Sequence, residues 1–282
     1  MAELFNRDFS VQIGPRLIRA RPEEDDVAKP TLRVFFKIEK SLAKAPNQAE
    51  VTIYNLSDDS RSAIQEKGAF CIVEAGYVGN VSQLFTGDLT FASTKKVGVD
   101  WISTFQSGDG SKQYRSSRIN ESFPKGTSLA QIMKRASTVL GVDLGNAVEK
   151  FNEGNFRKGF EAVSRGMVLQ GRTSDEIEKL LKSAGFKWSI QDGALQVLRD
   201  DETTEDEAIV LSSGAGLVES PEVGEKGIVT ATSLLQGRIR PGRSVNIESR
   251  ELSGFFKVLS VTHTGDTWDA KNWITQLEAK PL

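Results

Sequence analysis

The pattern of hydrophobic and polar residues changes twice along the chain. In the first third, hydrophobic and polar side chains alternate, most clearly through residues 32–38 and 49–54. A period of two places one set of side chains on the buried face of a β-strand. Ser57 is a suitable N-cap for a short helix after the second of these strands. Further strands are predicted at 70–77, 84–91 and 99–105.

Between residues 111 and 199 the spacing becomes helical. Hydrophobic residues within 129–140 recur at intervals of three and four, which is typical of a helix with one buried face. A second helix is predicted to begin near Thr173 or Ser174, either of which could cap it, and to end at Gly185. The middle of the chain is therefore predicted to contain α as well as β structure.

The same region also contains a predicted hairpin and an uneven distribution of charge. Asp192-Gly193 is a favoured two-residue turn and predicts a hairpin over 187–198. Residues 150–166 fit neither pattern and are assigned no element. Residues 112–199 contain 15 Lys and Arg against 9 Asp and Glu, so this insert is basic. Six acids within 200–207 predict an exposed linker.

Alternation returns from residue 208 to the C-terminus. Three strands are predicted, within 227–248, 254–266 and 273–279, and turns containing Gly and Pro join them. The sequence therefore predicts a mainly β fold with an α+β insert. The predicted domains are an N-terminal β-domain (1–110), the insert (111–207) and a C-terminal β-domain (208–282).

Composition narrows the class of protein. The 282 residues are enough to bury a substantial core. With 36 Lys and Arg against 38 Asp and Glu, the net charge of -2 argues against a general binder of nucleic acid or membrane surfaces. Residues 1–8 lack the apolar region of a signal peptide, and no apolar run approaches the ~20 residues of a membrane span. We therefore expect a soluble protein.

Few residues could support catalysis or bind a metal. Cys71 is the single cysteine, lies in an apolar strand and is predicted to be a small buried hydrophobic residue. His263 is the single histidine, and no Ser-His-Asp arrangement surrounds it; together these two residues cannot supply a usual zinc site. Gly214-Ala-Gly216 begins only an incomplete dinucleotide fingerprint. We predict no catalytic residue, no cofactor-binding residue and no metal ligand, and hence not an enzyme.

The four tryptophans could suggest a platform for a sugar or a nucleic-acid base. They fall in three separate segments, so packing in the core or at an interface explains them better. The residues are Trp101, Trp188, Trp268 and Trp273.

Two separated regions carry motifs that occur in this order in one known family. Ala49–Ser57 (AEVTIYNLS) is followed by Val73–Tyr77 (VEAGY) and Leu84–Gly87 (LFTG). The C-terminal region adds the series GIV, SLL, PG and WIT within 227–275. This combination resembles the baseplate hub proteins of contractile-tailed bacteriophages, a family shared with the spike bases of type VI secretion systems and with tailocins.

The resemblance implies a structural protein without a cofactor. Hub proteins of this kind are homotrimers in which each subunit contributes two tail-tube-like β-barrel or sandwich domains. The ring has pseudo-sixfold symmetry and joins a hexameric tail tube to a trimeric spike. The implied partners are the tail tube or a tube-initiator protein, the central spike, and wedge or tape-measure proteins. Such a protein is made in the cytoplasm of the host and ends in the tail baseplate of the virion, without a membrane span and without sequence-specific nucleic-acid binding.

Two alternative functions fit the same sequence. The basic insert could bind or degrade the bacterial cell wall. The chain could also be the spike-base component of a tailocin or a type VI secretion system, which would use the same joint.

Overall fold

A computed structural model of the chain describes residues 6–21, 30–65, 69–147, 150, 165–204, 207–269 and 271–282. Contacts divide the chain into two compact units. Unit 1 contains residues 1–41, 47–108 and 203–282, and unit 2 contains residues 42–46 and 109–202. Residues 151–164, which include most of the stretch that fits neither period, lie outside the described residues.

The N-terminal part of unit 1 confirms the alternation read from the sequence. Its strands are β1 (Arg7–Ile13), β2 (Arg16–Arg19), β3 (Val34–Ser41), β4 (Gln48–Tyr54), β5 (Phe70–Tyr77), β6 (Asn80–Val97) and β7 (Asp100–Gly108). Ser57 caps the short helix α1 (Asp58–Ile64) as predicted, because its side chain accepts a hydrogen bond from the backbone N–H of Ser60. Strand β6 is about twice as long as the predicted strand.

The C-terminal part of unit 1 contains more strands than the three predicted. Its strands are β12 (Ile209–Ser212), β13 (Glu222–Val223), β14 (Val229–Leu234), β15 (Ser244–Glu248), β16 (Ser253–Asp266) and β17 (Trp273–Pro281), with a 3-10 turn, η1 (Glu225–Gly227), before β14. The predicted single strand within 227–248 is wrong. Residues 235–243, which we call the 235–243 loop, separate β14 from β15 because Gly237, Pro241 and Gly242 favour turns.

Both ends of the chain contribute to a single sheet in unit 1. The strand order is β13-β14-β17-β16-β3-β4-β7-β6-β5-β1-β2, and β12 pairs in parallel with β15. The first half of β16 pairs with β15, and its second half, Ser260–Asp266, pairs with Ser41–Phe35 of β3. This pairing joins the two β-rich halves of unit 1 through main-chain hydrogen bonds.

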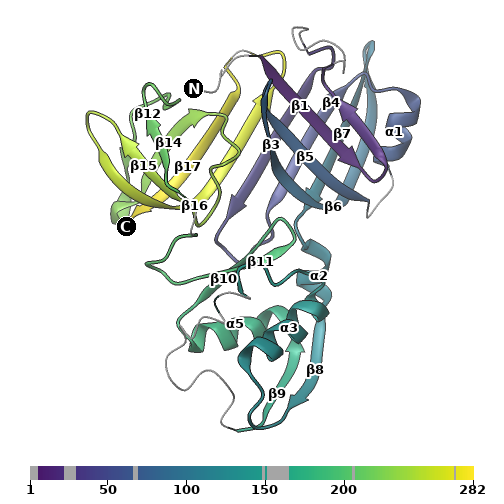
Figure 1. Ribbon diagram of the computed structural model, residues 1–282. Coiled ribbons are helices and arrows are strands. Elements are labelled where there is room, and N and C mark those ends of the chain that lie inside the picture. The colour runs from purple at the N-terminus through teal and green to yellow at the C-terminus, as the bar shows by residue number, and fades with distance from the viewer. Residues whose placement is uncertain are drawn as a thin grey trace. The chain divides into compact units, whose positions relative to one another are not determined.

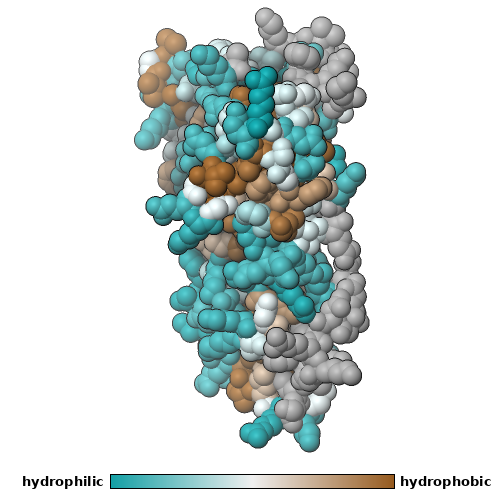
Figure 2. Space-filling model, turned by 90° about the vertical axis from the view of Figure 1, so that its left-hand side faces the viewer, coloured by the Kyte–Doolittle hydropathy of each residue, from teal (hydrophilic) through white to brown (hydrophobic). Residues whose placement is uncertain are grey.

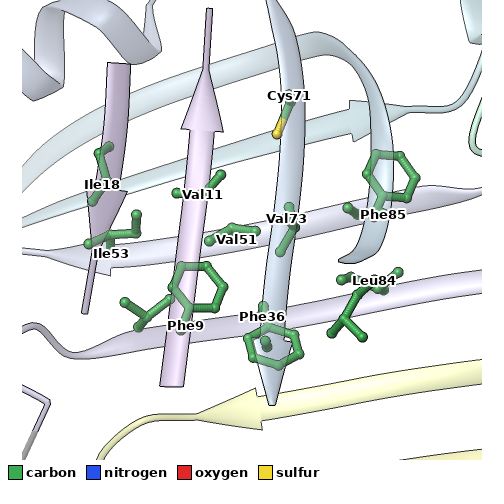
Figure 3. Close-up of a cluster of buried hydrophobic side chains, with 14 of the residues drawn as sticks. Phe9, Val11, Ile18, Phe36, Val51, Ile53, Cys71, Val73, Leu84 and Phe85 are labelled. Carbon is green, nitrogen blue, oxygen red and sulfur yellow. The ribbon is translucent and has the colours of Figure 1, made fainter. Parts of the chain in front are cut away.

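The N-terminal strands form two facing layers rather than a closed barrel. In Figure 1, β1, β5 and β6 lie in front of β3, β4 and β7. Within the described residues no strand connects β2 to β3, so the sheet stays open. Figure 3 shows Phe9 and Phe36 between the layers, where their rings stack with centroids 5.5 Å apart. The mainly β fold with an α+β insert is confirmed.

The core between these layers includes residues from the other end of the chain. The indole of Trp273, at the start of β17, packs edge-on against Phe36 with centroids 5.3 Å apart. Its Nε1–H donates a hydrogen bond to the carbonyl of Gly76 on β5. Leu235 joins the same cluster, whereas the remaining C-terminal strands enclose a second cluster around Val245, Val258 and Leu277. The N-terminal core is therefore completed by the C-terminal strands.

The 235–243 loop fastens the C-terminal half against β6. A Cβ atom on Gly237 would lie 2.1 Å from the hydroxyl of Ser82 and 2.5 Å from a methyl carbon of Leu84. Arg240 donates a hydrogen bond to the carbonyl of Gln83 at 3.1 Å. This close approach of the loop to a strand explains a glycine at position 237.

Unit 2 is the α+β insert. Its elements are α2 (Ser111–Ser116), β8 (Arg118–Phe123), α3 (Leu129–Leu140), β9 (Met167–Arg172), α5 (Thr173–Ser183), β10 (Lys187–Gln191) and β11 (Ala194–Leu198). Strand β8 pairs with β9, and β10 pairs with β11 across the predicted Asp192-Gly193 turn. Helices α3 and α5 and these two strand pairs enclose their own hydrophobic cluster.

The predicted cap of the second helix is wrong. Helix α5 follows β9 directly, so Arg172 is the N-cap and makes no side-chain capping bond. Thr173 and Ser174 lie inside the first turn and are buried. The backbone N–H of Thr173 instead donates to the carbonyl of Ser117, just before β8, so one of the first N–H groups of the helix has a partner outside it.

The three-part division into 1–110, 111–207 and 208–282 stays a prediction. Each predicted part contains one of the three hydrophobic clusters, although Leu235 and Trp273 cross into the first. One acid of the predicted linker makes an ion pair within unit 2: the carboxylate of Glu202 lies 2.5 Å from the Nζ of Lys150.

We predict that Gly237→Ala destabilises the protein by about 1–3 kcal/mol, because the new methyl group would overlap Ser82 and Leu84. The free energy of unfolding, measured by urea titration, would report the change. Gly214→Ala is the matched control, since no atom lies within 4 Å of a Cβ at that position. Equal midpoints for the two variants would show that the loop does not need this close approach.

Candidate functional site

The joint between β16 and β3 encloses a set of buried polar groups. His263 lies on β16 opposite Ile38 of β3 and Thr275 of β17. Its side chain is 1% exposed, and its Nδ1 is 2.9 Å from the Thr275 hydroxyl. The backbone N–H of Gln236 donates to the same hydroxyl at 3.0 Å. One hydroxyl therefore links β16, β17 and the 235–243 loop.

Two positive side chains accompany the histidine. Lys40 on β3 is 2% exposed, and its Nζ donates to the carbonyl of Leu84 at 3.4 Å. Arg240 of the 235–243 loop donates to the adjacent carbonyl of Gln83. Two neighbouring carbonyls of β6 thus accept hydrogen bonds from one cation of each half of unit 1. The bond of Arg240 crosses between the halves and helps to hold them together, whereas the bond of Lys40 lies within the N-terminal half.

The electrostatics of this joint oppose acid–base catalysis. Burial, together with the charges of Lys40 and Arg240, lowers the pKa of His263 to about 3. The imidazole is therefore neutral at neutral pH and poorly suited to accept a proton there. Its burial and its bond to Thr275 are those of a hydrogen-bonded core histidine.

Cys71 is confirmed as a small buried hydrophobic residue. It lies on β5 and is 0% exposed. Burial raises the pKa of the thiol to about 12, even though a hydrogen bond with Ser107 opposes the shift. A thiol in this state is a poor nucleophile, because the thiolate is the reactive form.

The four tryptophans divide into two pairs. Trp188 in unit 2 and Trp273 in unit 1 are buried, as core packing predicts. Trp101 and Trp268, by contrast, are 36% and 63% exposed. The guanidinium of Arg61 on α1 lies 4.3 Å from the centre of the Trp101 ring, so a cation–π contact fixes that side chain beside the β6–β7 hairpin.

Sequence reasoning missed the role of Asp109. Its carboxylate accepts hydrogen bonds from the backbone N–H groups of Asp192 and Gly193, at 2.7 and 2.9 Å. The turn predicted from Asp192-Gly193 is therefore held by an acid 83 residues earlier in the chain. A lone Asp between two glycines gives no sign of such a distant partner.

The outward face of the joined sheet is polar across both halves. One row of neighbours runs from Gln106 on β7 through Glu50 on β4 and Lys37 on β3 to Thr264 on β16. The next row places Glu39 beside Thr262. Unit 1 thus presents a hydrophilic surface on the side of the sheet opposite its cores.

In the described part of the chain, no group of three or more His, Cys, Asp and Glu side chains could hold a metal ion. No helix among these residues is long and apolar enough to cross a membrane.

Comparisons with known proteins identify a family and a fold. The model of the family described as Baseplate hub gp41 matches residues 17–252. A 43 kDa tail protein of the Shewanella oneidensis prophage MuSo2 has a similar structure, with a TM-score of 0.65 at 10% identity; the match covers 96% of this chain and 97% of that chain. No curated protein matches the sequence.

Two further solved structures share the fold. A tail protein of Neisseria meningitidis MC58 has a TM-score of 0.65 at 12% identity and covers 98% of this chain and 97% of its own. An Escherichia coli component of the type VI secretion system has a TM-score of 0.59 at 11% identity, with 89% of this chain and 73% of that chain covered. At these identities the likeness shows the fold alone.

We predict that protonation of His263 destabilises the joint as pH falls. The folded pKa of about 3 lies below the ordinary value of 6.5, so this contribution is fully present above pH 6.5 and is lost between pH 6.5 and 3. The free energy of unfolding lost by pH 3 is at most about 4 kcal/mol. Urea unfolding of the wild type and of His263→Gln at several pH values from 7.5 to 4 would measure it.

The two proteins should differ in slope, since only the wild type loses the histidine contribution. Carboxylates that titrate over the same range are common to both and cancel in the comparison. Parallel pH profiles for the two proteins would mean that His263 is not held neutral in the folded state.

Proposed function

The chain belongs to the Baseplate hub gp41 family, and from this premise we propose that three copies form a ring that joins a hexameric phage tail tube to a trimeric spike. Membership of the family gives the chain a structural role in a phage tail baseplate. The homotrimer, the contractile tail and the joining of tube to spike are the proposed parts.

The single observation that best supports this proposal is the sheet shared by the two β-rich halves. Seven residue pairs between β16 and β3 connect the halves, and β16 continues from one into the other. Hydrogen-bonded strands resist shear better than a flexible linker would. A subunit with two β-rich halves joined in this way suits a ring in which three chains must match six tube subunits.

The proposal includes no enzymatic activity. The neutral His263 and the protonated Cys71 support a non-catalytic role, because both are buried and neither is activated by its surroundings. We propose that the ring needs no cofactor and no metal ion. Its rigidity would come from main-chain pairing and from the two cores of unit 1.

The proposed partners follow from the position of a hub. They are the tail tube or a tube-initiator protein, the central spike, and wedge or tape-measure proteins. The protein would be made in the cytoplasm of the host and would become part of the tail baseplate. Within the chain, 1–110 and 208–282 would be the tube-like domains and 111–207 the insert between them.

A spike base of a secretion system or tailocin is the second candidate. The fold shared with the Escherichia coli type VI secretion component favours it, because the two chains align over most of their lengths. Both candidates use the same joint between tube and spike. Neighbouring genes for capsid proteins would indicate a phage, whereas their absence beside sheath and tube genes would indicate the second candidate.

We expect the purified protein to assemble into rings of three chains with a central opening. Native mass measurement and negative-stain class averages, with the protein alone and with its spike, would test this. A ring that forms only with the spike would show that the partner orders assembly. A protein that stays monomeric with the spike present would contradict the proposal and favour the wall-acting alternative, which release of muropeptides from purified cell wall would test.

A further inference from the structure

The second half of β6 has one long edge without a strand partner. Strand β6 pairs with β5 only as far as Asp88, and its second half then pairs with β7 alone. Within the described residues no strand covers the other edge of residues 90–97. Unpaired N–H and C=O groups along such an edge are a template for pairing with another chain.

This β6 edge carries exposed apolar and positive side chains. Phe91, Val97 and Val99 are 49%, 57% and 89% exposed. Lys95 and Lys96 are exposed between them. Large exposed apolar side chains beside an open edge indicate a surface that is covered in an assembly.

The end of the same sheet at β13 has the complementary character. Residues 217–223, which we call the 217–223 edge, lie along β14: Leu217 bridges Ser233, and β13 pairs with the start of β14. Val218 and Val223 are 51% and 60% exposed. The 217–223 edge also exposes two acids, Glu219 and Glu222.

The two edges lie at opposite ends of one run of strands, β6-β7-β4-β3-β16-β17-β14-β13. Figure 1 shows α1 and β14 on opposite sides of unit 1. Arg61 of α1 packs on Trp101 of the β6–β7 hairpin, so α1 marks the side of that hairpin. Figure 2, which views the side of β12 and β14, shows hydrophobic patches surrounded by hydrophilic side chains.

We infer that the β6 edge of one copy of this chain pairs with the 217–223 edge of the next copy. Apolar side chains meet apolar ones, and Lys95 and Lys96 meet Glu219 and Glu222. A contact between two different surfaces of identical chains is head-to-tail, and it closes into a ring when the rotation between copies is suitable. The inference rests on the proposed ring and names the surfaces that build it.

A second copy is the occupant that these observations favour. Each edge by itself could accept a strand from any protein. The two edges of one chain, however, have opposite charge and matching apolar content, which is expected when they face each other. Pairing would also join the sheets of neighbouring copies into one, with a continuous polar face that includes Glu50 and Thr264. In a closed ring this face would line the opening.

Charge reversal tests the pairing. We expect Lys95→Glu with Lys96→Glu, and separately Glu219→Lys with Glu222→Lys, to raise the subunit concentration needed for rings at least ~10-fold. All four reversals in one chain should restore assembly, because the charges at the contact are exchanged. Sedimentation velocity and negative-stain images of the full chain, with and without its spike, would measure assembly.

A matched control separates this effect from a change in net charge or folding. Lys134→Glu with Lys182→Glu alters the charge equally on exposed helix positions of unit 2 and should leave assembly unchanged. Circular dichroism should show the wild-type fold for every variant, because the reversed side chains are exposed.

Crosslinking gives an independent result. Ser93→Cys mixed with Ser220→Cys should yield disulfide-linked dimers on oxidation, whereas either variant alone should not. Suppose that the wild type forms rings, but the cysteine variants do not crosslink and charge reversal does not weaken assembly. The assigned edges are then wrong and the ring stands. If the wild type forms no ring under any condition, both the edges and the proposed function are wrong.

Discussion

The pairing of β16 with β3 is the constraint on which unit 1 depends. These strands are more than 200 residues apart in sequence, yet seven residue pairs connect them. Without that ladder each half would expose an open edge near its own core, and the core around Phe36 would lose the indole of Trp273. Loss of so large a buried aromatic group is among the most destabilising changes a core can suffer. The sheet and the core therefore depend on each other.

The polar groups in the joint add positional specificity to this pairing. Burial of Lys40 and His263 carries a desolvation cost, which the carbonyl of Leu84 and the Thr275 hydroxyl offset in part. A shift of the 235–243 loop along β6 would break both the bond of Arg240 to Gln83 and the bond of Gln236 to Thr275. Gly237 permits the close approach that lets Arg240 reach its carbonyl. Such a joint favours a single arrangement of the two halves.

The elements could be predicted from the sequence better than their arrangement. Alternation located β3, β4 and β5 because one face of each strand is buried, and Ser57 marked a helix because its capping bond is local. Pairing of distant strands leaves no comparable local signal, so the shared sheet and the role of Asp109 could not be read from the pattern. The cap of α5 was predicted wrongly because the backbone of Thr173 bonds to Ser117, which only the tertiary fold brings near.

In the proposed ring, open strand edges would have to be protected from wrong pairing. An edge that pairs with the next copy can also pair wrongly, and charged side chains are the usual protection against this. Lys95 and Lys96 on one edge and Glu219 and Glu222 on the other would repel a like edge and attract the opposite one. Two β6 edges could then not pair with each other, whereas a β6 edge and a 217–223 edge could. The same charges would thus both protect the free subunit from aggregation and set the head-to-tail direction in which copies join.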